Sequence, residues 1–295
     1  MNKKIGVISL LIGCLTFVSY MYVNKEKAPE EKENHYYKTV VFKDRDNELI
    51  PISMDLHNQM ELEQEIMNCI DIMKSTEFQE YGLYPVLSSE LEVLSVELKN
   101  HVLTLNTNDE IVANSDALNI LEALTFTCTD YDDVSRLQLQ INGQNISNLP
   151  NSFIPVSSLT KDLGLNNFIE TSTYLHETVP VMVYKQKNIM NYSYYIPTTL
   201  RIEENDSIDK QVKTILSHIQ SRIQLIDASL EDGTLHVQLG SNILLDNEKI
   251  DQALEDLIVL SLSTLKGVDN VDITINKESV RTKESSIIEY NRLKI

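Results

Sequence analysis

The chain has 295 residues, 42% of them hydrophobic, and is therefore long enough for two domains of ordinary size with packed cores. Twenty-five basic against 44 acidic residues give a net charge of −19 at pH 7, which argues against nucleic-acid binding because phosphate neutralisation needs clustered Lys and Arg. We interpret the charge as a means of solubility, with recognition of a basic partner as the alternative.

The N-terminus carries an apolar segment at residues 5–23, which follows two lysines and is long enough to cross a membrane as one helix. This pattern predicts an anchor over residues 1–23, with the bulk of the chain outside the cytoplasm. Residues 11–14 resemble a bacterial lipobox, so a lipoprotein modified at Cys14 is the alternative, and a cleaved soluble form is a third. Residues 24–35 are charged and aperiodic, which predicts a polar stalk.

Residues 36–147 are expected to form a first domain. Its segments alternate in the order hairpin, helix, hairpin, helix, strand, as judged from period-2 and helical spacing of the apolar residues. The predicted elements are strands 36–43 and 48–56, helix 62–73, strands 91–98 and 101–105, helix 117–128 and strand 137–141.

Residues 178–281 repeat this plan as a second domain. The repeat is clearest at the second hairpin, where Leu98 corresponds to Leu230 at an offset of 132 (230 − 98), and the Asp232-Gly233 turn is a strong hairpin signal. The loop at residues 82–85, Gly-Leu-Tyr-Pro, has no counterpart in this copy. The predicted elements are strands 179–184 and 190–200, helix 208–219, strands 223–230 and 235–239, helix 250–265 and strand 271–275.

Each copy is expected to place two helices on one side of a mainly antiparallel sheet. The predicted fold class is therefore α+β, with two tandem two-layer α/β sandwiches of order ββαββαβ behind the N-terminal membrane anchor. Residues 148–177 contain apolar groups that predict a linker packed on one or both domains, and residues 282–295 form a C-terminal tail.

The residue types that carry chemistry form no recognised site. The three cysteines make no CxxC pair, the six histidines no HExxH motif, and neither a G-x-S-x-G elbow nor a Gly-rich phosphate loop occurs. We predict no catalytic residue, no metal ligand and no cofactor. Two clusters of acidic residues could offer carboxylate oxygens to calcium. Neither cluster has the spacing of an ion-binding loop, so we interpret both as solvated turns. They consist of Asp44, Asp46 and Glu48, and of Asp130, Asp132 and Asp133.

Several segments of the chain, by their order and their repetition, resemble the GerM family, whose members carry tandem GerMN (sporulation and spore germination) domains. The resemblance implies a membrane-attached, non-enzymatic envelope protein of an endospore-forming bacterium, with protein association as its activity. The long apolar run past Cys14 departs from the usual lipoprotein pattern of the family. The segments that carry the resemblance are residues 40–44, 49–52, 82–85 with 94–96, 230–237 and 139–143.

From these observations we expect an extracytoplasmic envelope protein that mediates protein–protein assembly in sporulation or spore germination. Sheet edges are the expected contact surfaces, and two domains offer two valences. The expected partners are other extracytoplasmic envelope or sporulation proteins, with self-association as a further option and the membrane contacted through the N-terminus. The alternative is a peptidoglycan-active or small-ligand-sensing envelope protein, although glycan hydrolysis needs a facing carboxylate pair that the sequence does not identify.

Overall fold

The computed structural model describes residues 36–56, 60–113, 116–149, 155–157, 159–167, 177–245, 249–275, 278–284 and 291–293. The predicted anchor with Cys14 and the predicted stalk lie outside the described residues. Within those ranges, no helix combines the length and the apolar character needed to cross a membrane.

The first copy contains every element predicted for it, together with two short helical segments, η1 and α3, and a short strand, β6. Strands β1 and β2 form an antiparallel two-stranded sheet, and β3, β4, β5 and β6 form a second sheet in that order. The elements are β1 (Tyr37–Lys43), β2 (Leu49–Asp55), α2 (Leu62–Met73), η1 (Glu77–Tyr81), β3 (Val93–Lys99), β4 (Val102–Thr107), α3 (Glu110–Ala113), α4 (Ala117–Cys128), β5 (Arg136–Ile141) and β6 (Gln144–Asn145).

The second copy repeats the arrangement after a short helical turn, η2 (Lys161–Leu163), in the linker. Its hairpin β7–β8 is again a separate sheet, and its four-stranded sheet has the order β12, β11, β10, β9. The elements are β7 (Thr178–Ile189), β8 (Tyr192–Glu203), α5 (Ile208–Ile219), β9 (Leu225–Glu231), β10 (Thr234–Leu239), η4 (Ser241–Ile243), α6 (Gln252–Leu262), β11 (Asn270–Ile275) and β12 (Glu278–Glu284).

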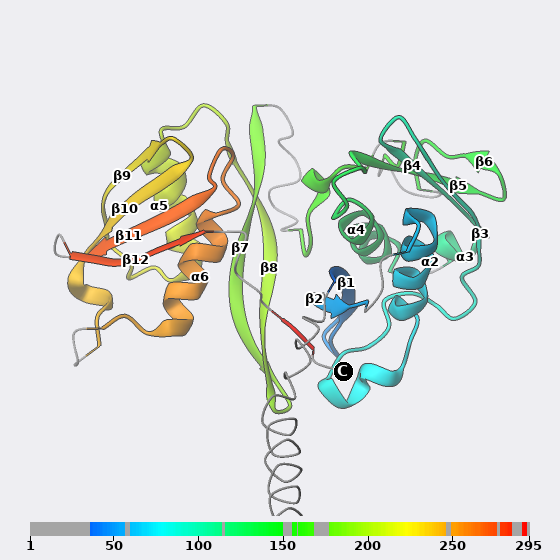
Figure 1. The fold of residues 1–295 in the computed structure, drawn as a ribbon, viewed down its shortest axis with the longest axis horizontal. Helices are drawn as coiled ribbons and strands as arrows, with labels where there is room; N and C mark the ends of the chain where they lie inside the picture. The colour runs from blue at the N-terminus through cyan, green and yellow to red at the C-terminus, as the bar shows by residue number, and fades with distance from the viewer. Residues whose placement is uncertain are drawn as a thin grey trace, which may run out of the picture. The chain divides into compact units, whose positions relative to one another are not determined.

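The α+β class and the element order agree with the sequence prediction, and the strands of each copy divide between two sheets. In the second copy, the helices lie between the hairpin and the larger sheet (Figure 1). In the first copy, every residue of helix α4 from Ile120 to Cys128 is buried, as expected for a helix between two layers. A helix that is buried on all sides requires cover from both layers. The helical crossover before β5 and β11 also makes their pairing with β4 and β10 parallel.

The described residues bury two apolar clusters, and the hairpin β7–β8 contributes to both. Val181 and Leu200, near the open end of the hairpin, belong to the second cluster together with α5, α6 and β9–β11. Tyr194 and Ile196, nearer its turn, belong to the first cluster, which is built from the first copy and includes Leu293 of the tail. The long second hairpin therefore joins the two copies.

Candidate functional site at the paired hairpins

Strands β2 and β8 are neighbours, and each carries a proline at the same position of the repeat, Pro51 and Pro197 (197 − 51 = 146). Proline has no N–H and cannot complete a ladder on its free side, so it is usually found at sheet edges. The two edges are bridged by side-chain amides from the linker and the tail.

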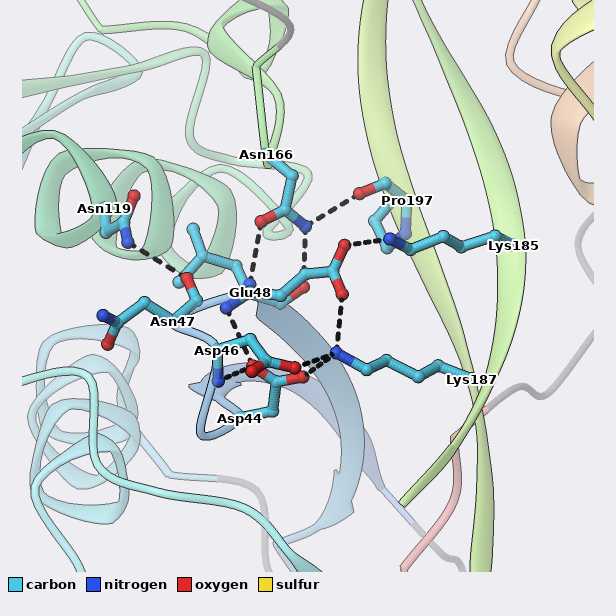
Figure 2. Close-up of polar contacts among 10 residues, drawn as sticks. Asp44, Asp46, Asn47, Glu48, Asn119, Asn166, Lys185, Lys187 and Pro197 are labelled. Atoms are coloured by element: carbon cyan, nitrogen blue, oxygen red, sulfur yellow. Dashed lines mark hydrogen bonds and ion pairs between the residues drawn. The ribbon is translucent and has the colours of Figure 1, made fainter.

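Asn166 of the linker bridges the two strands at one end. Its Oδ1 accepts a hydrogen bond from the N–H of Leu49 at 2.8 Å, and its Nδ2 donates to the carbonyls of Leu49 and Pro197, both at 2.8 Å (Figure 2). Asn166 has a φ of 50°, a left-handed conformation that Asn tolerates better than most residues. This local geometry lets one side chain reach both strands.

Asn291 of the tail makes the second bridge. Its Oδ1 accepts from the N–H of Tyr195 at 2.8 Å, and its Nδ2 donates to the carbonyls of Tyr195 and Pro51, both at 2.8 Å. Its φ of 56° is also left-handed, and its carbonyl accepts from the N–H of Ser53. The tail therefore docks between strands of different copies, and Leu293 beyond it is buried in the first core.

Glu122 of α4 holds the linker segment in place. Its carboxylate accepts from the backbone N–H of Asn166 at 2.7 Å and from Nδ2 of Asn167 at 2.5 Å, although the residue is only 1% exposed. Burial raises the pKa of Glu122, and the hydrogen bonds from Asn167 and Asn166 oppose that rise. A buried carboxylate thus has a structural role here, as the anchor of the bridging asparagine.

Lysine ammonium groups from the second hairpin meet the acidic turn of the first. Nζ of Lys187 lies 2.5 Å from Asp44 Oδ2, 2.8 Å from Asp46 Oδ2 and 3.2 Å from Glu48 Oε2, while Lys185 pairs with the other oxygen of Glu48 (Figure 2). The side chain of Asp44 is 3% exposed. The prediction of a solvated turn is therefore wrong for Asp44, because a lysine from a distant strand covers it.

The electrostatics of Asp44 follow from this contact. Burial alone would raise the pKa of Asp44, but the hydrogen bond from Lys187 and those from the backbone N–H groups of Glu48 and Asp46 together lower it below its ordinary value. The same contacts with Asp44 and Asp46 raise the pKa of Lys187. The ammonium group thus supplies the positive charge at these carboxylates.

The loop at residues 82–85 receives the turn of the second hairpin. Gly82 has a φ of +77°, and a Cβ at this position would lie 2.3 Å from Cγ2 of Ile189. The hydroxyl of Tyr194 donates to the carbonyl of Tyr81 at 2.9 Å, and the rings of Tyr81 and Tyr192 lie 5.0 Å apart. The loop missing from the second copy therefore serves as a contact between the copies.

The remaining edges differ in how far they are closed. The N–H of Thr39 in β1 donates to Asp130, and the N–H groups of Met182 and Tyr184 in β7 donate to Thr264 and Ser261. Side chains at the C-terminal ends of the helices therefore close the outer edges of both hairpins. Asp130 is engaged in this way, whereas Asp132 and Asp133 are exposed as a solvated turn would be.

Strands β3 and β9 are edges of the two four-stranded sheets, and each carries a large exposed apolar residue. Leu94 is 49% exposed and Ile226 is 54% exposed, and both lie at a register shift in their strand. Sheet edges in general were expected from the sequence as contact surfaces, and these two strands were not singled out. The bridging asparagines and Lys187 were not identified from the sequence: Asn166 lies in the linker, Asn291 in the tail and Lys187 in β7, and no motif marks any of them.

Comparisons with known proteins agree with this architecture. Residues 22–147 match the family model Germane, described as sporulation and spore germination. The chain is 23% identical over 187 residues to the spore germination protein GerM of Bacillus subtilis (strain 168), over 57% of this chain and 51% of the relative, so it spans about half of the relative's length. The solved tandem GerMN domains of the sporulation protein GerM from Bacillus subtilis have a TM-score of 0.69 at 18% identity, covering 82% of this chain and 92% of theirs. That likeness shows a shared fold.

Proposed function

We propose that this chain, which belongs to the GerM family and carries tandem GerMN domains, mediates protein–protein assembly in the cell envelope during sporulation or spore germination. The proposal covers a non-enzymatic role. It also places the chain at the membrane, with residues 1–23 as its anchor or, if Cys14 is lipidated, as its signal.

The observation that supports assembly is the contrast between the hairpin edges, which are closed, and the edges of the four-stranded sheets, which expose apolar residues. Both hairpins have their edges closed inside the molecule, by asparagines on one side and by helix side chains on the other. The four-stranded sheets instead end in β3 and β9, whose exposed apolar residues Leu94 and Ile226 face solvent. Sheet edges that expose apolar side chains are surfaces on which proteins associate.

Two buried carboxylates, those of Glu122 and Asp44, support a non-enzymatic role, because each joins the first copy to the linker or to the second copy. Glu122 binds the linker and Asp44 binds Lys187. A catalytic carboxylate must instead reach a substrate.

Chemical cross-linking of the full chain in its own sporulating cells tests the proposal. We expect adducts that join it to other envelope proteins and that decrease in the variant Leu94→Asp with Ile226→Asp. The surface variant Asn145→Ala is the control. A chain that stays monomeric in cells and in solution would contradict assembly, and release of fragments from purified peptidoglycan by the chain would contradict a non-enzymatic role.

A further inference from the structure

We propose that the partner adds a strand to β3 and not to β9, and that this strand carries Lys or Arg beside an apolar residue. This inference rests on the proposed function and specifies its site. It reduces the two valences expected from the repeat to one.

The edge strands β3 and β9 have a register shift at corresponding positions. The register of β3 shifts between Val93 and Ser95, and that of β9 shifts at the corresponding place, so that Leu94 and Ile226 are the unpaired residues (226 − 94 = 132). A bulge of this kind leaves an extra residue out of the ladder and re-aims its side chain. In both copies it turns a large apolar side chain toward solvent and interrupts strand addition at that point. Only the part of each edge that follows the bulge is left for a continuous ladder.

In that part of β9, a side chain caps an outward-pointing backbone N–H. The N–H of Ala228 donates to Oδ1 of Asp209, on the first turn of α5, at 2.9 Å. This bond shows that the N–H of Ala228 points away from β10, since outward and inward N–H groups alternate along an antiparallel edge. A strand approaching β9 would find this donor already occupied.

The edge of β3 lacks this cap. Val96 pairs with Leu105 as Ala228 pairs with Val237, so the N–H of Val96 points outward in the same way. The residue that corresponds to Asp209 is Glu63 of α2, and among the described residues no hydrogen bond joins Glu63, or any other side chain, to the N–H of Val96. The free donor makes β3 the edge that can still accept a strand.

The charge around β3 decides the chemistry of that strand. Glu92 and Glu97 are exposed on or beside the strand, and Glu61 is exposed before α2, the helix that packs against β3. Lys99 is the one basic residue of β3. Opposite charges stabilise cross-strand pairs and like charges destabilise them, so a second copy of β3 is a poor partner and a basic strand is a good one. The net charge of −19 acts in the same direction over longer distances.

Site-specific photo-cross-linking in sporulating cells tests the inference. The full chain carries p-benzoylphenylalanine in place of Leu94 or, as the matched position, of Ile226. We expect an adduct from position 94 whose cross-linked peptide, sequenced by mass spectrometry, comes from a different protein and is rich in Lys or Arg. We expect no adduct from position 226.

Three further variants test the causes. Glu97→Lys should lower the adduct yield from position 94 by roughly fivefold, whereas Glu231→Lys on β9, with the same change in net charge, should not. Asp209→Ala frees the N–H of Ala228 and should produce an adduct from position 226. Circular dichroism melting curves establish that each variant is folded.

An adduct of position 94 with a second copy of the chain, or with an acidic peptide, would overturn the proposed partner chemistry. Equal adducts from positions 94 and 226, or no gain in Asp209→Ala, would overturn the role of the cap. If neither position forms an adduct while chemical cross-linking still joins the chain to envelope proteins, the inference fails and the proposed function stands. If no cross-link to any protein forms, both fail.

Discussion

Asn166 and Asn291 make the same three hydrogen bonds to exchanged members of one strand pair. Asn166 binds the N–H and carbonyl of Leu49 and the carbonyl of Pro197, whereas Asn291 binds the N–H and carbonyl of Tyr195 and the carbonyl of Pro51. At the repeat offset of 146, Leu49 corresponds to Tyr195 (195 − 49) and Pro51 corresponds to Pro197 (197 − 51). The contact between the hairpins therefore has local two-fold pseudosymmetry.

Replacing either asparagine by Ala should weaken this contact. Asn166→Ala and Asn291→Ala each remove three hydrogen bonds to partly buried backbone groups, and we expect each to lower the free energy of unfolding by about 2–4 kcal/mol. Urea unfolding followed by circular dichroism measures this. Asn145→Ala, an exposed amide on β6, should change stability by less than about 0.5 kcal/mol. Equal effects at all three positions would show that the bridges do not stabilise the contact.

Lys187→Met should make stability less dependent on acid pH. The pKa of Asp44 is lower in the folded chain than its ordinary value of 3.8, so its ion pair contributes fully above that pH and is lost as the pH falls through the folded-state pKa. We expect Lys187→Met to cost about 1–3 kcal/mol at pH 7 and progressively less below about pH 3.8. Urea unfolding between pH 7 and pH 3 measures the difference.

The exposed Lys213 of α5 provides the control, since Lys213→Met should have little effect at any of these pH values. A loss in Lys187→Met that stays constant down to pH 3 would mean that the lysine acts through packing and not through its charge.

Gly82→Ala should destabilise the chain for two separable reasons. Gly143 has the same φ of +77° with nothing within 4 Å of its Cβ position, so Gly143→Ala reports the backbone cost alone, about 1 kcal/mol. Gly82→Ala adds a collision with Ile189, and we expect the larger loss. Combining it with Ile189→Ala should recover the steric part in a double-mutant cycle. No coupling between the two sites would place the second hairpin away from this loop.

Leu235→Asp tests the division into domains 36–147 and 178–281, which we retain as a proposal. Leu235 is fully buried in the second core, and Leu103 is its counterpart in the first. Cys69 and Cys128 are buried in the first core, and burial raises the pKa of Cys69 to about 11, so labelling with N-ethylmaleimide reports unfolding of that core. We expect both thiols to stay protected in Leu235→Asp and to react in Leu103→Asp. Reaction of both thiols in Leu235→Asp would show that the copies unfold as one unit.

The elements and their repetition follow from the sequence alone, because helical and strand periods are local properties of the chain. The offset of 132 between Leu98 and Leu230 reflects two hairpins that the structure contains at β3–β4 and β9–β10. The resemblance of the chain to the GerM family was confirmed by the comparisons, in which the family model matches residues 22–147.

Which side chains contact one another, in contrast, depends on the tertiary structure. Lys187 and Asp44 are 143 residues apart, and Asn291 and Pro51 are 240 apart, so no local pattern relates them. The division of strands between two sheets, the cover over Asp44 and the cap of Asp209 on Ala228 all depend on such distant contacts. Periodicity shows which face of an element is buried, but burial against a particular partner depends on the path of the whole chain.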